Sequence, residues 1–232
     1  PGGSAGAVPY PDNQWASFRS GATPGMALAI TGADGTLIRC TSAFAARDED
    51  NTPLVLTAGH CFPAGARSYA EYGVITGSAG KVRLDRLGTV DTAQSRTTPA
   101  ARRTVEWVTD FAVIRVDPSV APVATIADTY AVSEVATADR LTRGMTVCKY
   151  GYRTQETCGP VVAVEDGFVR VNLYSRTGDS GAPAYLKLGG NTVAAVGLLS
   201  SSPKMGTFTD DYVTDFALLA PILSQMRINL SR

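Results

Sequence analysis

Three short segments of the chain contain residue types that carry out nucleophilic and acid–base chemistry. His60, the one histidine of the chain, follows an apolar run in segment 57–61 (TAGHC), and Asp110 begins another apolar run. Ser180 lies between glycines in segment 178–181 (GDSG). A serine hydroxyl needs an adjacent base to become a nucleophile, and that base needs a group to orient it. The three residues therefore predict a serine nucleophile, a histidine base and an orienting aspartate.

Each segment alone has an ordinary explanation, as a surface turn, a packed histidine or a turn aspartate. Taken together, the three segments favour the catalytic explanation over the ordinary ones. They occur in the order His60, Asp110, Ser180, with separations of 50 and 70 residues. His, Asp and Ser occur in this order in chymotrypsin, whereas unrelated hydrolases use other orders. The glycines around Ser180 allow a sharp turn in which the amides of Gly178 and Ser180 face a developing oxyanion.

The four cysteines form two local pairs, with Cys40 and Cys61 21 positions apart and Cys148 and Cys158 ten positions apart. No two have the C-x-x-C spacing of zinc ribbons or thioredoxins. Two disulfides fit this spacing, and four buried free thiols are the alternative. Disulfides require an oxidising compartment, so we expect a secreted or otherwise extracytoplasmic protein. A single histidine excludes a multi-histidine metal site, and we expect no metal and no cofactor.

Short apolar or β-branched runs separated by turn residues predict an all-β protein built from antiparallel barrels or sandwiches. Asp166-Gly167 between two valine-rich runs predicts a hairpin. One segment has helical periodicity, and Thr214 or Asp215 can cap its start. Its apolar positions are Phe216, Leu219, Leu223, Met226 and Leu230. The fold prediction is therefore mostly β with a C-terminal α-helix.

Composition and segment boundaries limit the organisation and the partners. Among 232 residues, 21 are Lys or Arg and 21 are Asp or Glu, so the net charge is zero and nucleic-acid binding through bulk electrostatics is not expected. The longest apolar run, 193–199, is far shorter than the roughly 20 residues of a membrane span. Segment 117–128 contains two prolines and is the best candidate for a connection. We therefore predict an N-terminal arm and first barrel in 1–118, a second barrel and helix in 119–232, and a monomer.

Together the motifs resemble the chymotrypsin-like serine proteases, above all the bacterial branch that includes alpha-lytic protease and the streptogrisins. The resemblance rests on segments 57–61, 110–113 (DFAV) and 178–183 (GDSGAP), and it extends from about Met26 to Met226. Segment 147–159 is similar to the stretch of alpha-lytic protease whose two cysteines have the same separation. The resemblance implies two six-stranded antiparallel β-barrels with the active site in the cleft between them.

The resemblance also implies the role of each residue. Ser180 attacks a peptide carbonyl, His60 takes and later returns the proton, and Asp110 holds the His60 tautomer. The amides of Gly178 and Ser180 stabilise the oxyanion. The expected function is that of a secreted serine endopeptidase that acts on polypeptides through an acyl-enzyme. The alternatives are a catalytically silent or zymogen-like protein that acts as a binding module, and a narrow esterase or processing protease.

Asp179, which directly precedes the predicted nucleophile, needs a cationic partner in this family. In chymotrypsin the partner is a new N-terminal ammonium group, and in the bacterial branch it is an internal arginine whose position matches Lys149. We predict that Lys149 pairs with Asp179 and keeps the oxyanion loop formed. Arg140 and Arg143 are rival partners, and a solvated Lys149 is the alternative.

Further assignments concern the support of the aspartate and the binding of substrate. Ser200 matches the serine whose hydroxyl supports the triad aspartate. Ser200, Ser201 and Ser202 match the strand that pairs with an extended substrate, and a core strand followed by a serine-rich loop is the alternative for Ser201 and Ser202. Ser202 also replaces a glycine that is common at the pocket mouth.

The predicted specificity pocket departs from the family pattern. Tyr174 occupies the position at which trypsin has aspartate, so specificity for basic side chains is not expected. Arg176 could contact an acidic substrate side chain or be solvated. Ala182 replaces a glycine, and a cysteine that commonly precedes the nucleophile is absent. We expect a small or medium apolar residue before the cleaved bond.

Overall fold

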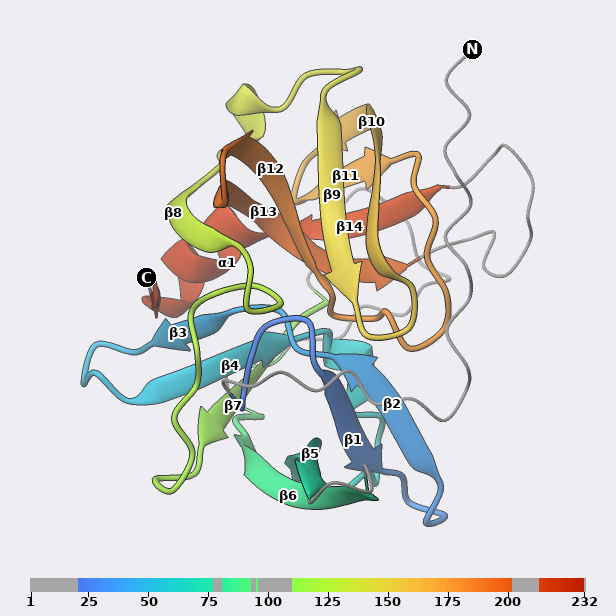
Figure 1. The fold of residues 1–232 in the computed structure, drawn as a ribbon, viewed down its shortest axis with the longest axis vertical. Helices are drawn as coiled ribbons and strands as arrows, with labels where there is room; N and C mark the ends of the chain where they lie inside the picture. The colour runs from blue at the N-terminus through green and yellow to red at the C-terminus, as the bar shows by residue number, and fades with distance from the viewer. Residues whose placement is uncertain (1–20, 77–80, 93–94, 96–109, 202–212, 232) are drawn as a thin grey trace.

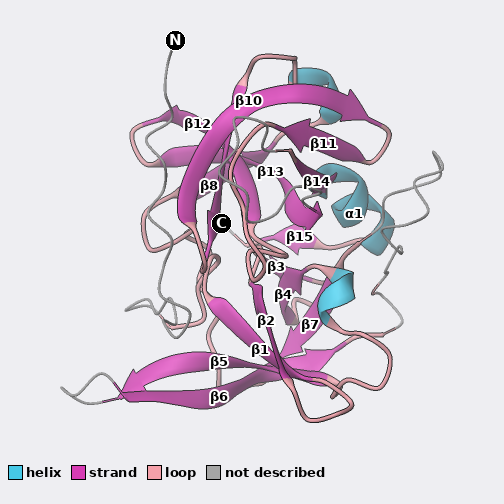
Figure 2. Ribbon diagram, turned by 90° about the vertical axis from the view of Figure 1, so that its right-hand side faces the viewer, coloured by secondary structure: helices cyan, strands magenta, loops and turns pink. Residues whose placement is uncertain are grey.

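The computed structural model describes residues 21–76, 81–92, 95, 110–201 and 213–231. In these ranges the chain forms two sheets, with a single α-helix near the C-terminus (Figure 1). Figure 2 shows the sheets one above the other, with β1, β2 and β5–β7 in the lower part and β10–β14 in the upper part. The predicted all-β fold is therefore confirmed.

The first sheet has eight strands in the order β15-β3-β4-β7-β6-β5-β1-β2, and every neighbouring pair is antiparallel. The strands are β1 (Ala27–Thr31), β2 (Leu37–Thr41), β3 (Ala45–Arg47), β4 (Pro53–Thr57), β5 (Tyr69–Thr76), β6 (Lys81–Val90), β7 (Ala112–Val116) and β15 (Asn229–Leu230). The pairing of β4 with β7 ends at Thr57 opposite Ala112. Because the pair is antiparallel, the end of β4 lies beside the start of β7. The segments that carry His60 and Asp110 therefore lie at the same end of this strand pair.

The second sheet has seven strands in the order β12-β9-β10-β11-β14-β13-β8. The strands are β8 (Ala131–Val135), β9 (Thr146–Gly151), β10 (Gln155–Glu165), β11 (Phe168–Val171), β12 (Pro183–Gly189), β13 (Thr192–Ser201) and β14 (Thr214–Leu218). A further pairing of β12 with β13 closes six of these strands into a barrel, and β8 joins β13 in parallel. The predicted hairpin at Asp166-Gly167 connects β10 to β11, with Gly167 at a φ of 84°.

The predicted C-terminal helix is confirmed, but it is shorter than its periodicity suggested. Helix α1 (Leu219–Met226) starts after β14, so Thr214 and Asp215 do not cap it. Both lie in a strand that pairs with β11 and β13, because this buried backbone finds its hydrogen-bond partners there. Arg227, in a left-handed conformation, ends the helix. Two short 3₁₀ turns, η1 (Gly59–Cys61) and η2 (Ala138–Arg140), complete the described elements.

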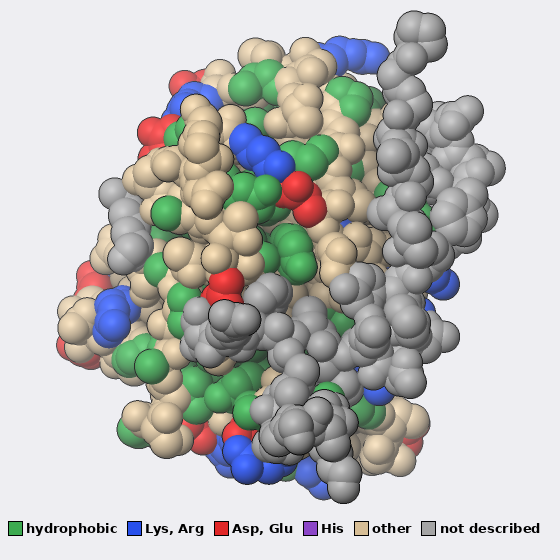
Figure 3. All heavy atoms as spheres, viewed as in Figure 1, with side chains coloured by type: hydrophobic (Ala, Val, Ile, Leu, Met, Phe, Trp, Pro, Cys, Tyr) green, Lys and Arg blue, Asp and Glu red, His purple; other side chains and the backbone are tan. Residues whose placement is uncertain are grey.

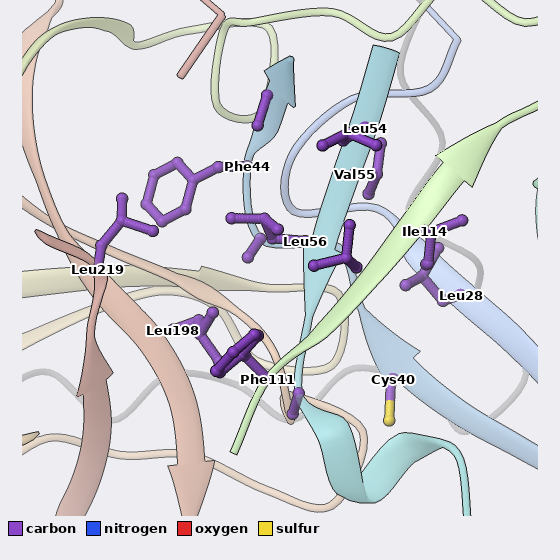
Figure 4. Close-up of a cluster of buried hydrophobic side chains, with 14 of the residues drawn as sticks. Leu28, Cys40, Phe44, Leu54, Val55, Leu56, Phe111, Ile114, Leu198 and Leu219 are labelled. Carbon is purple, nitrogen blue, oxygen red and sulfur yellow. The ribbon is translucent and has the colours of Figure 1, made fainter. Parts of the chain in front are cut away.

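The larger hydrophobic core lies in the first sheet and continues across the junction with the second. Figure 4 shows Phe111 beside Leu198 of β13, and Phe44 facing Leu219 at the start of α1. All four side chains are buried. Phe111 directly follows Asp110, so its packing fixes the backbone from which the aspartate projects. A second cluster fills the barrel of β9–β14.

The surface of the described ranges has mixed charge. On the face shown in Figure 3, basic and acidic side chains are interspersed among polar and apolar ones. Among the helices of the residues described, none has the length and apolar character needed to cross a membrane.

Candidate active site

His60 and Asp110 form the centre of the site. His60 Nδ1 lies 2.6 Å from Asp110 Oδ2, and the His60 amide donates to Asp110 Oδ1 at 2.8 Å. The aspartate is buried, whereas 39% of the histidine side chain is exposed. Because a carboxylate only accepts hydrogen bonds, Nδ1 is the donor and Nε2 keeps a lone pair that can accept a proton. The pair can therefore act as an oriented base.

Asp110 receives a further hydrogen bond from the second sheet. Ser200, near the end of β13, donates from Oγ to Asp110 Oδ2 at 2.7 Å. With the two contacts from His60, three donors surround a carboxylate that is almost entirely buried. A buried charge needs such partners, because it has lost its water. The hydroxyl that sequence analysis assigned to the aspartate is thus in contact with it.

The pKa of His60 reflects two opposing influences. Burial acts to lower it, but the hydrogen bond and the negative charge of Asp110 act to raise it, and the net result is a pKa above the usual histidine value. The imidazolium form is therefore stabilised, which favours acceptance of a proton by Nε2.

The loop 178–181, which carries Ser180, is held against the first sheet. The amide of Thr41, at the end of β2, donates to the carbonyl of Ser180 at 2.8 Å. Gly181 has a φ of 86°, and a Cβ there would clash with Thr57 Oγ1 and the Thr41 carbonyl. The glycine after Ser180 thus permits contact with the strand that leads to His60. No hydrogen bond joins Ser180 Oγ to His60 Nε2 in the described ranges; catalytic hydrogen bonds are often long in unliganded enzymes.

Within the part of the chain that the structure describes, the amides of Gly178 and Ser180 donate to no protein acceptor. The neighbouring amides are engaged, since that of Asp179 donates to the Arg176 carbonyl at 2.9 Å and that of Gly181 to the Leu199 carbonyl at 2.7 Å. Gly178 has a φ of 105°, which a glycine adopts without strain. The two unused donors are those that sequence analysis assigned to the oxyanion.

Lys149 of β9 and Asp179 form an ion pair that is completely buried. Lys149 Nζ lies 3.6 Å from Asp179 Oδ2, and both side chains are 0% exposed. The hydroxyl of Thr154 connects them, since it accepts from Lys149 and donates to Asp179 Oδ2 at 2.6 Å. Burial lowers the pKa of Lys149, against the opposing influence of Asp179. The predicted pairing is present, whereas the rival Arg140 pairs with Glu134 and Arg143 is exposed.

Both disulfides are formed with the predicted partners. Cys40–Cys61 joins β2 to the turn that carries His60, and Cys148–Cys158 joins β9 to β10 beside Lys149. The one group of described residues with metal-ligand spacing is Cys148, Glu156 and Cys158. Because both of its cysteines are in a disulfide, it offers no thiolate to a metal.

The predicted substrate-binding residues differ in their burial and in their hydrogen-bond partners. Tyr174 is buried, and its carbonyl accepts from Thr157 Oγ1 at 2.7 Å. Arg176 contacts Asp179 through its backbone, with its amide donating to Oδ2 at 3.0 Å. Ser201 ends β13 and lies opposite Asp215 of β14, and its Oγ is 3.5 Å from Asp215 Oδ2. Ser202 lies outside the described residues.

Several polar residues that contact the loop or lie near it carry no motif in the sequence. Thr154 connects Lys149 to Asp179, and Thr41 contacts both the loop and β4. Ser175 and Thr214, whose hydroxyls are 2.9 Å apart, form a buried polar contact next to Tyr174. Buried threonines and serines have no sequence signature, because their hydroxyls bond to partners that are distant in the chain.

Solved structures with the same fold include several bacterial proteases. A protease described as specific for glutamic acid, with a histidine triad in substrate binding, has a TM-score of 0.63 at 22% identity, covering 90% of this chain and 100% of that one. A Nocardiopsis protease has a TM-score of 0.62 at 20% identity, covering 91% and 99%. A homologue of alpha-lytic protease has a TM-score of 0.57 at 24% identity, covering 90% and 98%. At these identities the likeness establishes the fold.

Sequence comparison identifies the family. Two uncharacterized proteins of Mycobacterium tuberculosis, from strains CDC 1551 and H37Rv, are each 33% identical to this chain over 159 residues. The match covers 64% of this chain and 62% of the length of these curated relatives. A comparison with protein families matches residues 49–217 to the family described as Trypsin. That range is more than half of the chain, which therefore belongs to the trypsin family.

Proposed function

We propose that this protein is a serine endopeptidase that hydrolyses polypeptides through an acyl-enzyme intermediate. The observation that supports it most directly is the chain of hydrogen bonds from Ser200 to Asp110 and from His60 to Asp110, beside the loop of Ser180. In a protein of the trypsin family, this arrangement supports acyl transfer more directly than any other reaction.

The residues would act in sequence. Ser180 Oγ attacks the substrate carbonyl while its proton passes to His60 Nε2, and the amides of Gly178 and Ser180 stabilise the negative charge on the carbonyl oxygen. His60 then donates the proton to the leaving amine, and the Ser180 ester remains. Water attacks this ester with His60 again as base, and Ser180 is released. Asp110 keeps the His60 tautomer and stabilises its charged form throughout.

The end of β13 offers an edge for an extended substrate. Its ladder with β12 ends at Leu198, and the next residue exchanges hydrogen bonds with Ala182 and Gly181. Ser200 and Ser201 continue the strand beyond this ladder. We propose that the substrate backbone adds there as a further strand, as extended peptides do at open sheet edges.

We propose a small or medium apolar side chain before the cleaved bond. Tyr174 is buried at the position where trypsin has aspartate, and the acid that follows Thr214, Asp215, already pairs with Arg170 at 2.8 Å. The glutamate-specific relative in fold is described as using a histidine triad for its substrate. This chain has one histidine, and that residue contacts Asp110. Recognition of an acidic substrate side chain by a histidine triad is therefore excluded.

We also propose a location, an oligomeric state and a domain division for the protein. Two disulfides support a secreted or extracytoplasmic location. We propose a monomer that acts on polypeptide substrates without nucleic acid, and a division into units 1–118 and 119–232. The strands of the first sheet come from the first unit except β15, and those of the second come from the second unit.

Comparison of three substrate classes tests this function. The protein is incubated with a small activated ester, with casein and with a peptide library, and the Ser180→Ala variant serves as control. Cleavage of casein and of many peptides, absent in the variant, is the expected result. Cleavage of the ester alone would favour a narrow esterase or processing protease. No cleavage of any substrate would favour a binding module.

The rate of hydrolysis is expected to rise with pH as His60 loses its proton, because only the neutral imidazole can accept a proton from Ser180. Since the folded environment raises the pKa of His60, the midpoint of this rise in rate is expected at a pH above the usual histidine pKa of about 6.5. The check is kcat/KM measured from about pH 4 to pH 9 at constant ionic strength. A flat profile across this range would contradict a histidine base.

A further inference from the structure

Thr41 connects the loop of Ser180 to β2 and to the segment that contains Tyr152. Thr41 is fully buried at the end of β2, in the first sheet, and it precedes Gly178 by 137 residues in the sequence. Its hydroxyl donates to the carbonyl of Gly178 at 2.8 Å and accepts from the amide of Tyr152 at 3.2 Å. Its own amide donates to the carbonyl of Ser180 at 2.8 Å. Two carbonyls of one catalytic loop are thus held by a single residue.

These contacts belong to a closed ring in which hydrogen bonds alternate with short stretches of backbone. From Thr41 the ring passes to Gly178 and to Asp179, whose Oδ1 accepts the amides of Arg153 and Thr154, each at 3.1 Å. Tyr152, one residue before Arg153, closes the ring by donating to Thr41 Oγ1. The Thr41 hydroxyl and the Lys149–Asp179 pair therefore both hold the backbone of this loop.

Thr41 holds the two peptide planes that flank the plane of the free Ser180 amide. Each peptide group is planar, so a fixed carbonyl also fixes the amide on the far side of the same plane. The carbonyls of Gly178 and Ser180 are held by Thr41, and that of Asp179 accepts from the Ala182 amide at 2.8 Å. Three successive peptide planes are thus fixed. The middle plane contains the amide of Ser180, which donates to no acceptor in the described ranges.

We infer that Thr41 is a positioning residue for the reaction, whose hydroxyl holds the 178–180 backbone so that its free amides and Ser180 Oγ keep their catalytic geometry. This inference rests on the proposed function of the same site. Its basis is the pair of hydrogen bonds at Thr41 Oγ1, one given to Gly178 and one taken from Tyr152. The Thr41 amide contact to Ser180 is made by backbone and persists in any variant, so substitution isolates the hydroxyl.

Three variants test the inference. Thr41→Val keeps the shape of the side chain but removes the hydroxyl, and Thr41→Ser keeps the hydroxyl. Ser42→Ala is the matched control, because Ser42 is equally buried and its Oγ donates to the Thr23 carbonyl at 2.8 Å, away from the loop. Each variant is assayed for kcat and KM on a peptide substrate, with the concentration of folded sites measured by active-site titration. Binding of a peptide boronate, which forms a tetrahedral adduct, is measured as well.

For Thr41→Val we expect kcat per titrated site to fall about 10- to 100-fold, since displacement of an oxyanion donor affects the transition state far more than substrate binding. KM should change by less than about threefold, and boronate affinity should fall in parallel with kcat. Thr41→Ser and Ser42→Ala should stay within about threefold of the parent, because the first keeps both hydrogen bonds and the second lies outside the ring.

The outcomes separate this inference from the proposed function. If the parent hydrolyses peptides and Thr41→Val has the same kcat per site and the same boronate affinity, the positioning role is wrong while the protease function stands. If Ser42→Ala loses as much kcat as Thr41→Val, any buried hydroxyl in this region has the same effect and the specific role is wrong. If the parent neither hydrolyses peptides nor binds the boronate, the proposed function fails and the inference fails with it.

Discussion

Replacement of Ser180 by alanine is expected to lower kcat by a factor on the order of 10⁴ to 10⁶, with little change in KM. The variant lacks the nucleophile, so no acyl-enzyme can form, while the remaining site still binds substrate. The hydroxyl of Ser180 has no hydrogen bond in the described ranges, and the residue is half-buried. The free energy of unfolding should therefore change by less than about 0.5 kcal/mol. Steady-state kinetics and thermal unfolding measure the two effects.

A double variant makes this prediction sharper. Residues that act as one unit are not additive, so His60→Ala combined with Ser180→Ala should be no slower than Ser180→Ala alone. Ser224→Ala, at an exposed position on α1, is the control for a serine-to-alanine change and should leave kcat unchanged. Independent, multiplicative losses in the double variant would contradict a shared role of His60 and Ser180.

Replacement of Lys149 by methionine is expected to lower the free energy of unfolding by about 3–5 kcal/mol, because it leaves the charge of Asp179 buried without a counter-ion. Both side chains are 0% exposed, so water cannot compensate. For a chain of this size that loss corresponds to a decrease in Tm of roughly 10 °C. Turnover should also fall, because Asp179 is in the loop that presents the amides of Gly178 and Ser180. Denaturant unfolding and kcat per titrated site are the measurements.

Lys187→Met is the matched control for this substitution. Lys187 pairs with Glu156 at 2.9 Å, but 42% of its side chain is exposed, and such surface pairs contribute about 0–1 kcal/mol. Its variant should unfold at nearly the parent temperature and retain turnover. Equal stability and unchanged turnover in Lys149→Met would overturn the role assigned to the buried pair.

The local motifs of the sequence predicted the contact between His60 and Asp110 at the centre of the site. His60 and Asp110 meet because β4 and β7 are antiparallel neighbours, and both apolar runs were visible in the sequence. Cysteine spacing predicted both disulfides, and Asp166-Gly167 predicted the hairpin between β10 and β11. These features depend on residues that are close in sequence or that belong to a distinctive motif.

The supporting contacts were harder to predict, because they depend on tertiary packing. Thr154 and Thr41 contact the loop of Ser180 through hydroxyls from segments 25 and 137 residues away, and no local pattern distinguishes them from other threonines. The helix boundary was wrong for a related reason. Phe216 fits the helical period of α1, but β11 and β13 draw the segment 214–218 into the barrel as a strand.

Labelling with a fluorophosphonate tests the central claim most directly. Attack of Ser180 Oγ on phosphorus expels fluoride and forms a stable phosphonyl ester, and this requires both the His60 base and the oxyanion amides. Intact mass of the labelled parent should show a single adduct, with none on Ser180→Ala. Absence of an adduct on the parent, or an equal adduct on the variant, would contradict an assembled serine-protease site.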